Sequence, residues 1–191
     1  MQIITYPHPT LRHVSQPIRR VDADLKKLVR EMFDLMYAAK GIGLAANQVD
    51  LPVRLFIMNL TSKPDGEEQV FINPVVSSPK GSDEAEEGCL SLPGLYGQVI
   101  RPKTVRVNAY NLSGQEIQRE LSGLEARCLQ HELDHLDGVL FPDRMSVGNR
   151  ANVIEELQEF EADFVSRRGT GGIPSDSILT AQRAEWERKY C

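Results

Sequence analysis

The stretch QHELDHLDG, residues 130–138, places two histidines four residues apart in a segment that reads as a helix. Side chains four residues apart on a helix project in the same direction, so His131 and His135 can bind one metal ion together. Glu132 lies one position further round the helix, close to such an ion without having to bind it. That placement suits a general base acting on water at the metal. The stretch therefore predicts a metal-dependent hydrolase.

The helix that carries this stretch is predicted to begin near Ser122 and to end at Gly138. Successive side chains on a helix are rotated by roughly 100°, which puts its apolar residues on two faces. One face carries Leu124, Cys128, His131 and His135, and the nearly opposite face carries Leu129, Leu133 and Leu136. Because a helix with two apolar faces is usually buried, we expect it to be the central helix of the core.

The rest of the chain shows helices and strands that are segregated rather than alternating. Apolar residues at helical spacing indicate helices over residues 22–41 and 152–165. Alternating and β-branched stretches indicate strands over residues 53–60 and 70–76 and a hairpin over residues 104–121. We therefore expect an α+β fold with antiparallel sheets packed around the central metal-binding helix, an N-terminal helix and a C-terminal helix.

Length and composition predict one catalytic domain with a short extension. The chain has 191 residues, 41% of them hydrophobic and 26% charged, which suits a single globular domain. We expect the catalytic domain to cover residues 1–166. The segment RRGTGGIPSDS breaks the helical pattern, so residues 167–191 are predicted to be a C-terminal extension made of a linker and a short helix.

Charge and cysteine content restrict the functional classes. The net charge is −5 and no cluster of Lys and Arg offers a face for phosphates, so sequence-specific nucleic-acid binding is not expected. No stretch approaches the ~20 apolar residues that cross a bilayer, and the first residues do not read as a secretory signal. The chain has only three cysteines, an odd number, so a disulfide framework is not expected. These features predict a cytoplasmic protein that does not bind membranes.

Residue types and spacing alone do not decide which residue is the third metal ligand. The metzincin pattern would place a histidine at position 141, but Phe141 stands there. A zinc endopeptidase would take a glutamate from a later helix, for which Glu155 and Glu156 are at a suitable distance along the chain. Cys89, in the Gly- and Pro-bounded stretch EEGCLSLPG, is the third candidate, because a thiolate joins two imidazoles well. A structural metal site in a binding module is the non-enzymatic alternative, although it leaves Glu132 without a task.

A second motif, GIGLAANQV over residues 41–49, follows the first predicted helix. Gly41 and Gly43 permit close backbone approach, and the side-chain amide of Gln48 can donate a hydrogen bond to a developing oxyanion. Together with EGCLS (87–91) and QHELDH (130–135), the segment GIGLAANQ resembles the three motifs of the peptide deformylase family, in the same order and spacing. The resemblance covers roughly residues 3–146 and is more specific than any one motif.

The resemblance implies a set of site residues. Cys89 would be the third metal ligand, beside His131 and His135. Glu132 would be the general base and acid, and the oxyanion hole would combine Gln48 with the backbone N–H of Leu90. The pocket for the methionine side chain would be built from Ile42, Gly43, Gly88, Leu124 and Cys128. The resemblance also implies an ion pair between Glu87 and Arg101.

Two positions depart from the family pattern. Tyr96 stands where many bacterial members have an arginine near the substrate. Arg127 resembles a plastid-like subgroup, whereas other members have an apolar pocket residue there.

The resemblance implies an enzyme that removes the formyl group from the N-terminal N-formylmethionine of newly synthesised proteins and releases formate. Its cofactor would be one divalent metal ion, with Fe²⁺ expected in the cell and Zn²⁺, Ni²⁺ or Co²⁺ as alternatives. Its partners would be N-formylmethionyl nascent polypeptides, met through transient association with the ribosome. The zinc endopeptidase is the alternative enzyme.

Overall fold

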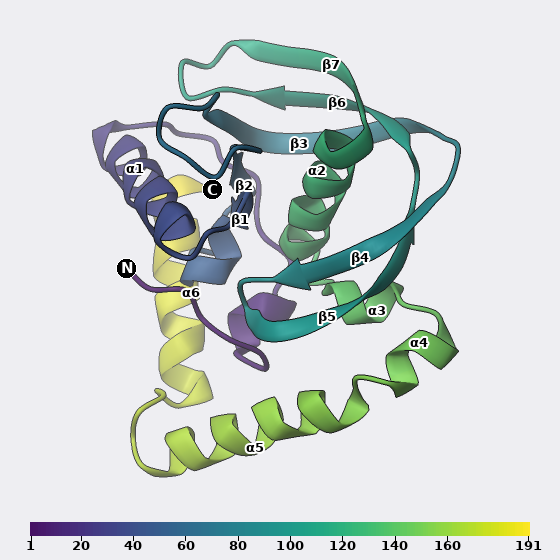
Figure 1. Cartoon of the computed structure of the whole chain (residues 1–191). Coiled ribbons are helices and arrows are strands. Elements are labelled where there is room, and N and C mark those ends of the chain that lie inside the picture. Colours follow the sequence, from purple (N-terminus) through teal and green to yellow (C-terminus); the bar gives the residue numbers. More distant parts are fainter.

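The computed structural model describes all residues from 1 to 191 and confirms the predicted α+β architecture. A five-stranded antiparallel sheet has the order β1-β2-β3-β6-β7, and β4 and β5 form a separate two-stranded hairpin. The strands are β1 (Gly43–Ala45), β2 (Leu55–Met58), β3 (Gln69–Lys80), β4 (Asp83–Cys89), β5 (Leu92–Arg101), β6 (Thr104–Tyr110) and β7 (Glu116–Ser122). The central helix α2 (Gly123–Leu136) lies between the five-stranded sheet and the β4–β5 hairpin (Figure 1).

The remaining helices lie around this arrangement (Figure 1). They are α1 (Ala23–Ala38), α3 (Phe141–Arg144), α4 (Val147–Ala151), α5 (Ile154–Gly169) and α6 (Asp176–Tyr190), with the 3-10 turns η1 (Pro9–Arg12) and η2 (Ala46–Val49). None of the helices is long and apolar enough to cross a membrane.

Helix α1 forms as its sequence predicts. The Asp22 side chain accepts a hydrogen bond from the Leu25 N–H at 2.9 Å, which satisfies a free donor of the first turn. Its apolar stripe is buried against the sheet and consists of Leu25, Val29, Met32, Phe33 and Met36. The helix ends at Ala38, three residues before the predicted end at residue 41, and Lys40 adopts the left-handed conformation (φ 57°) just after it.

Helix α2 is the buried central helix that its two apolar faces predict. It begins after Ser122, although the Ser122 side chain makes no capping hydrogen bond, and it ends before Gly138. Gly138 has φ 71°, and a Cβ added there would lie 2.6 Å from the Arg12 carbonyl oxygen. A glycine is therefore required at this point both for the backbone conformation and for the close packing of the N-terminal segment.

The hairpin of β4 and β5 was absent from the sequence-based expectation. Strand β4 has the sequence DEAEEGC, in which acidic residues leave no apolar alternation to recognise. It becomes a strand because it pairs with β5 over the register Asp83↔Arg101 to Gly88↔Tyr96, with an irregularity between Gly88 and Cys89. Cross-strand pairing of this kind is a tertiary effect that local propensity does not report.

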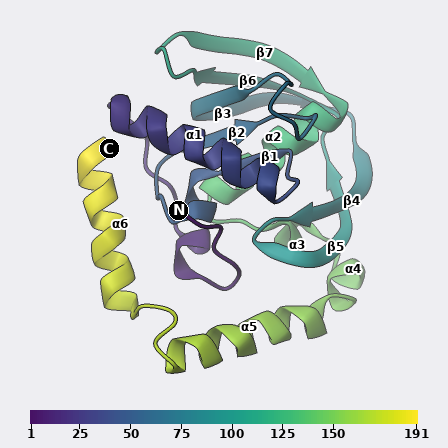
Figure 2. The same ribbon diagram turned by 60° about the vertical axis from the view of Figure 1, so that its left-hand side comes forward.

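The C-terminal segment is more ordered than predicted. Helix α5 continues to Gly169, three residues into the expected linker, and α6 is a full helix of 15 residues rather than a short one. Figure 2 shows α6 turning back along the molecule from the end of α5 and finishing beside the start of α1. The Lys189 ammonium lies 2.9 Å from the Asp24 carboxylate, and Tyr190, 2% exposed, joins the apolar cluster of Leu25 and Val29. The last residues are therefore part of the core.

We predict that Tyr190→Ala lowers the free energy of unfolding by about 3 kcal/mol, because it removes a buried aromatic ring and leaves a cavity. Ile178→Ala on the same helix is the matched control: Ile178 is exposed, so its loss should change stability by less than about 0.5 kcal/mol. Urea unfolding followed by circular dichroism measures both. Equal, small effects would mean that α6 does not contribute to the core.

Candidate metal centre

Three potential ligands from two distant parts of the chain meet at one point. Cys89 comes from the end of β4, and His131 and His135 come from successive turns of α2; their ligand atoms all lie within 4.8 Å of one another. The two Nε2 atoms are 3.3 Å apart, and the Cys89 Sγ lies 3.2 Å from the His135 Nε2. Ligands around a tetrahedral zinc-sized ion are separated by roughly 3.3–3.6 Å. The cluster is therefore a metal-binding triad with the donors and spacing of a transition-metal site.

The orientation of His131 is fixed by a buried carboxylate. The His131 Nδ1 lies 2.9 Å from Glu87 Oε2, so Nε2 is directed to the triad. Burial would lower the pKa of His131, but the interactions with Cys89 and Glu87 raise it to about 10. The anionic surroundings that favour a proton on this ring also favour a cation at the triad.

Glu87 is the centre of a buried charge network. Arg101 contacts it through two nitrogens at 2.6 and 2.9 Å, which is the pair that the resemblance implied. Arg127 donates a further hydrogen bond to Glu87 at 2.7 Å. Burial would raise the pKa of Glu87, but hydrogen bonds from His131 and Arg101 lower it to about 2. Glu87 is therefore a carboxylate at neutral pH.

The network extends to two residues that the sequence analysis did not single out. Asp134, on α2, accepts a hydrogen bond from Arg101 at 2.8 Å and another from Arg144 at 2.6 Å. Asp134 is the fourth residue of HELDH. It lies three positions after His131 on the same helix, and this proximity to a candidate ligand was the one local signal that it could support the site. Arg144 had no such signal, because α3 reaches α2 only in the folded chain.

Glu132 is buried beside the triad and is 4% exposed. Burial raises its pKa to about 7, although the positive charges of His131 and Arg101 act against this. Its Oε2 has no hydrogen-bond partner in the protein. A Cβ added at Gly43 would lie 2.4 Å from Glu132 Oε1, so glycine is needed at 43 to leave room for the carboxylate. A carboxyl group with a pKa near neutrality can both accept and return a proton.

Gln48 presents its amide nitrogen to the triad. Its Oε1 accepts the Ala45 N–H at 2.8 Å, which leaves Nε2 facing Ser91 Oγ at 3.1 Å and Cys89 Sγ at 3.5 Å. The backbone N–H of Leu90, adjacent to Cys89, donates to no acceptor in the protein. Two N–H donors thus lie next to the triad and can stabilise negative charge on a bound oxygen.

A cavity of about 670 Å³ opens beside these groups. Its walls include all five residues expected to form the substrate pocket, namely Ile42, Gly43, Gly88, Leu124 and Cys128, and also Gln48, Cys89, Leu90, His131 and Glu132. Tyr96, 59% exposed, stands at its mouth, and a Cβ at Gly88 would collide with the Tyr96 ring at 2.6 Å. Arg127 lines the cavity while it pairs with Glu87. Burial raises the pKa of Cys128 well above its usual range, so its thiol remains protonated.

The residues considered as alternative third ligands lie elsewhere. Glu155 and Glu156 are exposed on α5 and do not belong to the triad. Phe141 packs its ring against His131, with centroids 6.3 Å apart and planes at 23°. The structure therefore places neither the endopeptidase glutamate nor a metzincin-type ligand at the metal site.

Comparisons with known proteins agree with this site. The polypeptide deformylase family profile matches residues 1–151. The peptide deformylase of Rhodopirellula baltica is 56% identical over 191 residues, which are 100% of this chain and 95% of that protein. The chloroplastic peptide deformylase 1B of rice is 43% identical over 180 residues, 93% of this chain and 66% of that protein. The crystal structure of Arabidopsis thaliana peptide deformylase 1B with an inhibitor is 42% identical, has a TM-score of 0.84, and covers 92% of this chain and 97% of that one.

We predict that Cys89→Ala sharply lowers the amount of metal that co-purifies with the protein, because two imidazoles alone hold a divalent ion weakly. Glu155→Ala and Glu156→Ala are the controls and should leave the metal content near that of the unmodified chain. Elemental analysis of the purified proteins measures all three. Metal loss in a glutamate variant, with retention in Cys89→Ala, would contradict the triad.

Proposed function

Because the chain belongs to the polypeptide deformylase family, it is an enzyme that removes the formyl group from N-formylmethionine, and we propose that Glu132 is the base of this reaction. The observation that carries the assignment is the position of the Glu132 carboxylate. It is buried beside the triad against Gly43, and its pKa is about 7. The other two carboxyl groups of the cavity lack these properties, because Glu86 is exposed and Glu87 pairs with two arginines and has its pKa lowered to about 2.

Glu132 would act twice in one turnover. It first takes a proton from the attacking water, whose oxygen then bonds to the formyl carbon. It next gives that proton to the amine nitrogen of methionine as the carbon–nitrogen bond breaks, and formate leaves. A base that becomes the acid of the second step needs a pKa near the working pH, which the burial of Glu132 supports.

Gln48 and Leu90 would stabilise the oxyanion that forms between these two steps. The Gln48 amide is held by the Ala45 N–H, so its Nε2 is preset to donate rather than having to turn. The Leu90 N–H is free to donate a second hydrogen bond. Each such fixed donor contributes about 3 kcal/mol to transition-state stabilisation in comparable sites.

The metal would be held by Cys89, His131 and His135. Three ligands of this type fit an ion that keeps a further position open, as catalytic sites do. When bound, a divalent ion supplies Lewis acidity that activates both water and the formyl carbonyl. We propose ferrous iron as the ion used in the cell, with zinc, nickel or cobalt accepted by the same donors. Glu87 would keep the His131 ring oriented toward the ion.

The methionine side chain would enter the cavity lined by the expected pocket residues. Ile42 and Leu124 offer apolar contact, and the neutral thiol of Cys128 behaves as a small apolar group. Gly43 and Gly88 would let the substrate backbone approach the protein closely. Tyr96 is exposed and lines the cavity, where it would contact the residues that follow methionine.

The proposed substrates are N-formylmethionyl chains as they emerge from the ribosome in the cytoplasm, met through transient association. The support is the substrate itself, because formylmethionine stands at the start of a new chain.

We assign the catalytic role to residues 1–166 and a stabilising role to residues 167–191. That division is supported by the triad and Glu132, which all precede residue 166, and by the burial of Tyr190.

We predict that Glu132→Gln keeps its metal but loses at least about 100-fold in kcat on a formylmethionyl peptide, because the ligands remain while the base is lost. Formate release and metal content are measured on the same preparation. Full metal loss in this variant would show that Glu132 is itself a ligand, and the assignment as base would be wrong.

The identity of the metal gives a second prediction. Protein loaded with ferrous iron without oxygen should turn over faster than the zinc form and lose activity in air, since a thiolate beside a redox-active ion is exposed to oxidation. The nickel or cobalt form should last longer in air. Formate release per bound metal, before and after aeration, is the measurement. A zinc form that is the fastest, with no effect of air on the iron form, would contradict the proposal for iron.

A further inference from the structure

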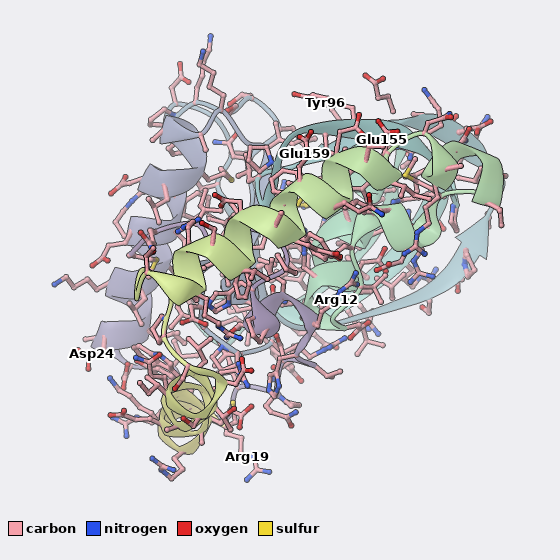
Figure 3. The ribbon with its side chains drawn as sticks, turned by 90° about the horizontal axis from the view of Figure 1, so that it is seen from below. Arg12, Arg19, Asp24, Tyr96, Glu155 and Glu159 are labelled. Atoms are coloured by element: carbon pink, nitrogen blue, oxygen red, sulfur yellow. The ribbon has the colours of Figure 1, made fainter.

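A second cavity lies beyond η2 from the catalytic one. Gln48 lines the catalytic cavity, whereas the next two residues, Val49 and Asp50, line the second one, which has a volume of about 380 Å³. Its other walls are the N-terminal residues 1–5 with His8, helices α5 and α6, and the turn between these helices. Figure 2 shows the N-terminal segment inside the corner that α5 and α6 make, and Figure 3 shows α5 crossing this face of the molecule before the chain turns into α6. The two cavities share no lining residue, so the second is a separate site.

A buried imidazole faces the second cavity without a partner. The side chain of His8 lines this cavity and is 9% exposed. Its Nδ1 accepts the Thr10 N–H at 3.3 Å, where it caps η1. Burial lowers the pKa of His8, and the neighbouring Asp50 carboxylate only partly offsets this, so the ring is neutral at neutral pH.

The opposite ring nitrogen of His8 is a free donor. A neutral imidazole whose Nδ1 accepts a hydrogen bond carries its proton on Nε2. No group of the protein bonds this Nε2, and the protein does not enclose the atom completely. A nearly buried donor without a partner is unfavourable, and an acceptor on a bound molecule would relieve this cost. The cavity therefore calls for a ligand with an oxygen acceptor at this point.

The charges around His8 favour an anion over a cation. Two carboxylates and two guanidinium groups act on its ring and offset each other, namely Asp50, Asp176, Arg168 and Arg183. Arg167 also lines the cavity, and its one ion pair, with Asp163 at 3.6 Å, is exposed on both sides. Because an exposed pair of this length contributes little, Arg167 adds a positive charge beside the cavity.

The remaining wall of the cavity is largely apolar. Four of its apolar side chains are buried, namely Val49, Phe164, Ile173 and Leu179. The Phe164 ring stands edge-on to the His8 ring, with centroids 6.3 Å apart, so the free donor lies beside apolar surface. Pockets for small molecules combine such walls with a few polar groups that fix orientation, in volumes of roughly 300–1,000 Å³. The second cavity has this composition and this size.

We propose that the second cavity binds small monocarboxylic acids with an apolar body, of the size of a medium-chain fatty acid. The carboxylate accepts the His8 Nε2–H and lies near Arg167, and the apolar body packs against Phe164, Ile173 and Leu179. This site takes no group from the proposed reaction, and its ligand is not the formylated substrate. It is supported by the buried free donor, the excess positive charge and the apolar wall.

The test compares three probes that share an eight-carbon chain and differ in the head group. At neutral pH octanoate is an anion, octanamide is uncharged and octylamine is a cation. Calorimetric titration of the full-length metal-loaded protein gives a Kd for each. We expect a Kd below about 1 mM for octanoate. Octanamide and octylamine should bind at least about tenfold more weakly, because hydrogen bonds to an ionised acceptor are roughly twice as strong as neutral ones.

Two substitutions of His8 locate the probe. His8→Asn keeps an oxygen that can cap η1 but has no donor that reaches as far as Nε2, so octanoate should bind at least about tenfold more weakly. His8→Gln places an amide nitrogen at about the reach of Nε2, and its Kd should stay within about threefold of the unmodified protein. Thermal unfolding verifies that both variants remain folded.

A matched pair of arginine variants tests the charge. Arg167→Gln should weaken octanoate by about threefold and leave octanamide unchanged. Arg188→Gln is the control, because Arg188 is exposed on α6, does not line the cavity and changes the net charge by the same amount. The control should bind octanoate as the unmodified protein does.

Four outcomes would overturn the inference. None of the probes could bind the folded protein, or octylamine could bind as well as octanoate. Octanoate could bind His8→Asn as tightly as the unmodified protein, which would place it in the catalytic cavity on the metal. Arg188→Gln could weaken octanoate as much as Arg167→Gln does, which would assign the effect to net charge. Binding is measured without substrate, so these results do not depend on the proposed function.

Discussion

The buried carboxylate of Glu87 joins the two parts of the molecule that make the metal centre. It binds Arg101 across the β4–β5 hairpin, and it contacts Arg127 and His131 on α2. Cys89 follows two residues later on the same strand, so the contact that attaches the hairpin to the helix also brings the thiolate to the two imidazoles. Two further ion pairs, Arg101–Asp134 and Arg127–Asp83, also join the hairpin to α2, and charged hydrogen bonds of this kind position it with more directional precision than apolar contacts alone.

Glu87 belongs to a chain of alternating charges that is largely buried. Arg127, Glu87, Arg101, Asp134 and Arg144 follow one another, each paired with the next at 2.6 to 2.8 Å. Four members of this chain are buried, and loss of the partner of a buried charge typically costs about 3–5 kcal/mol because it leaves that charge uncompensated. The Arg144 side chain is half exposed, so its pair with Asp134 contributes less. The alternation therefore makes the network cooperative. It holds β4, β5, α2 and α3 in one arrangement around the site.

Two carboxyl groups near the triad have opposite properties because their surroundings differ. Glu87 receives hydrogen bonds from two arginines and His131, and its pKa falls to about 2. Glu132 is equally buried but lies against Gly43 with one oxygen unpartnered, and its pKa rises to about 7. One group is thus a permanent anion that orients a ligand, and the other can exchange a proton. The same carboxyl group therefore has opposite acid–base properties at the two positions because of its contacts alone.

The sequence by itself determined what depends on spacing within one element. His131, Glu132 and His135 lie within five consecutive residues, so helical geometry alone brings them together, and the apolar faces of the same helix predict its burial. Residue chemistry did not decide whether the third ligand was Cys89 or a glutamate of α5. Only the resemblance to a family favoured the cysteine. Tertiary structure decided it, because a ligand from another element depends on the path of the chain between them. The same holds for the acidic strand β4, the charge network around Glu87 and the packing of α6, each of which exists only through partners distant in sequence.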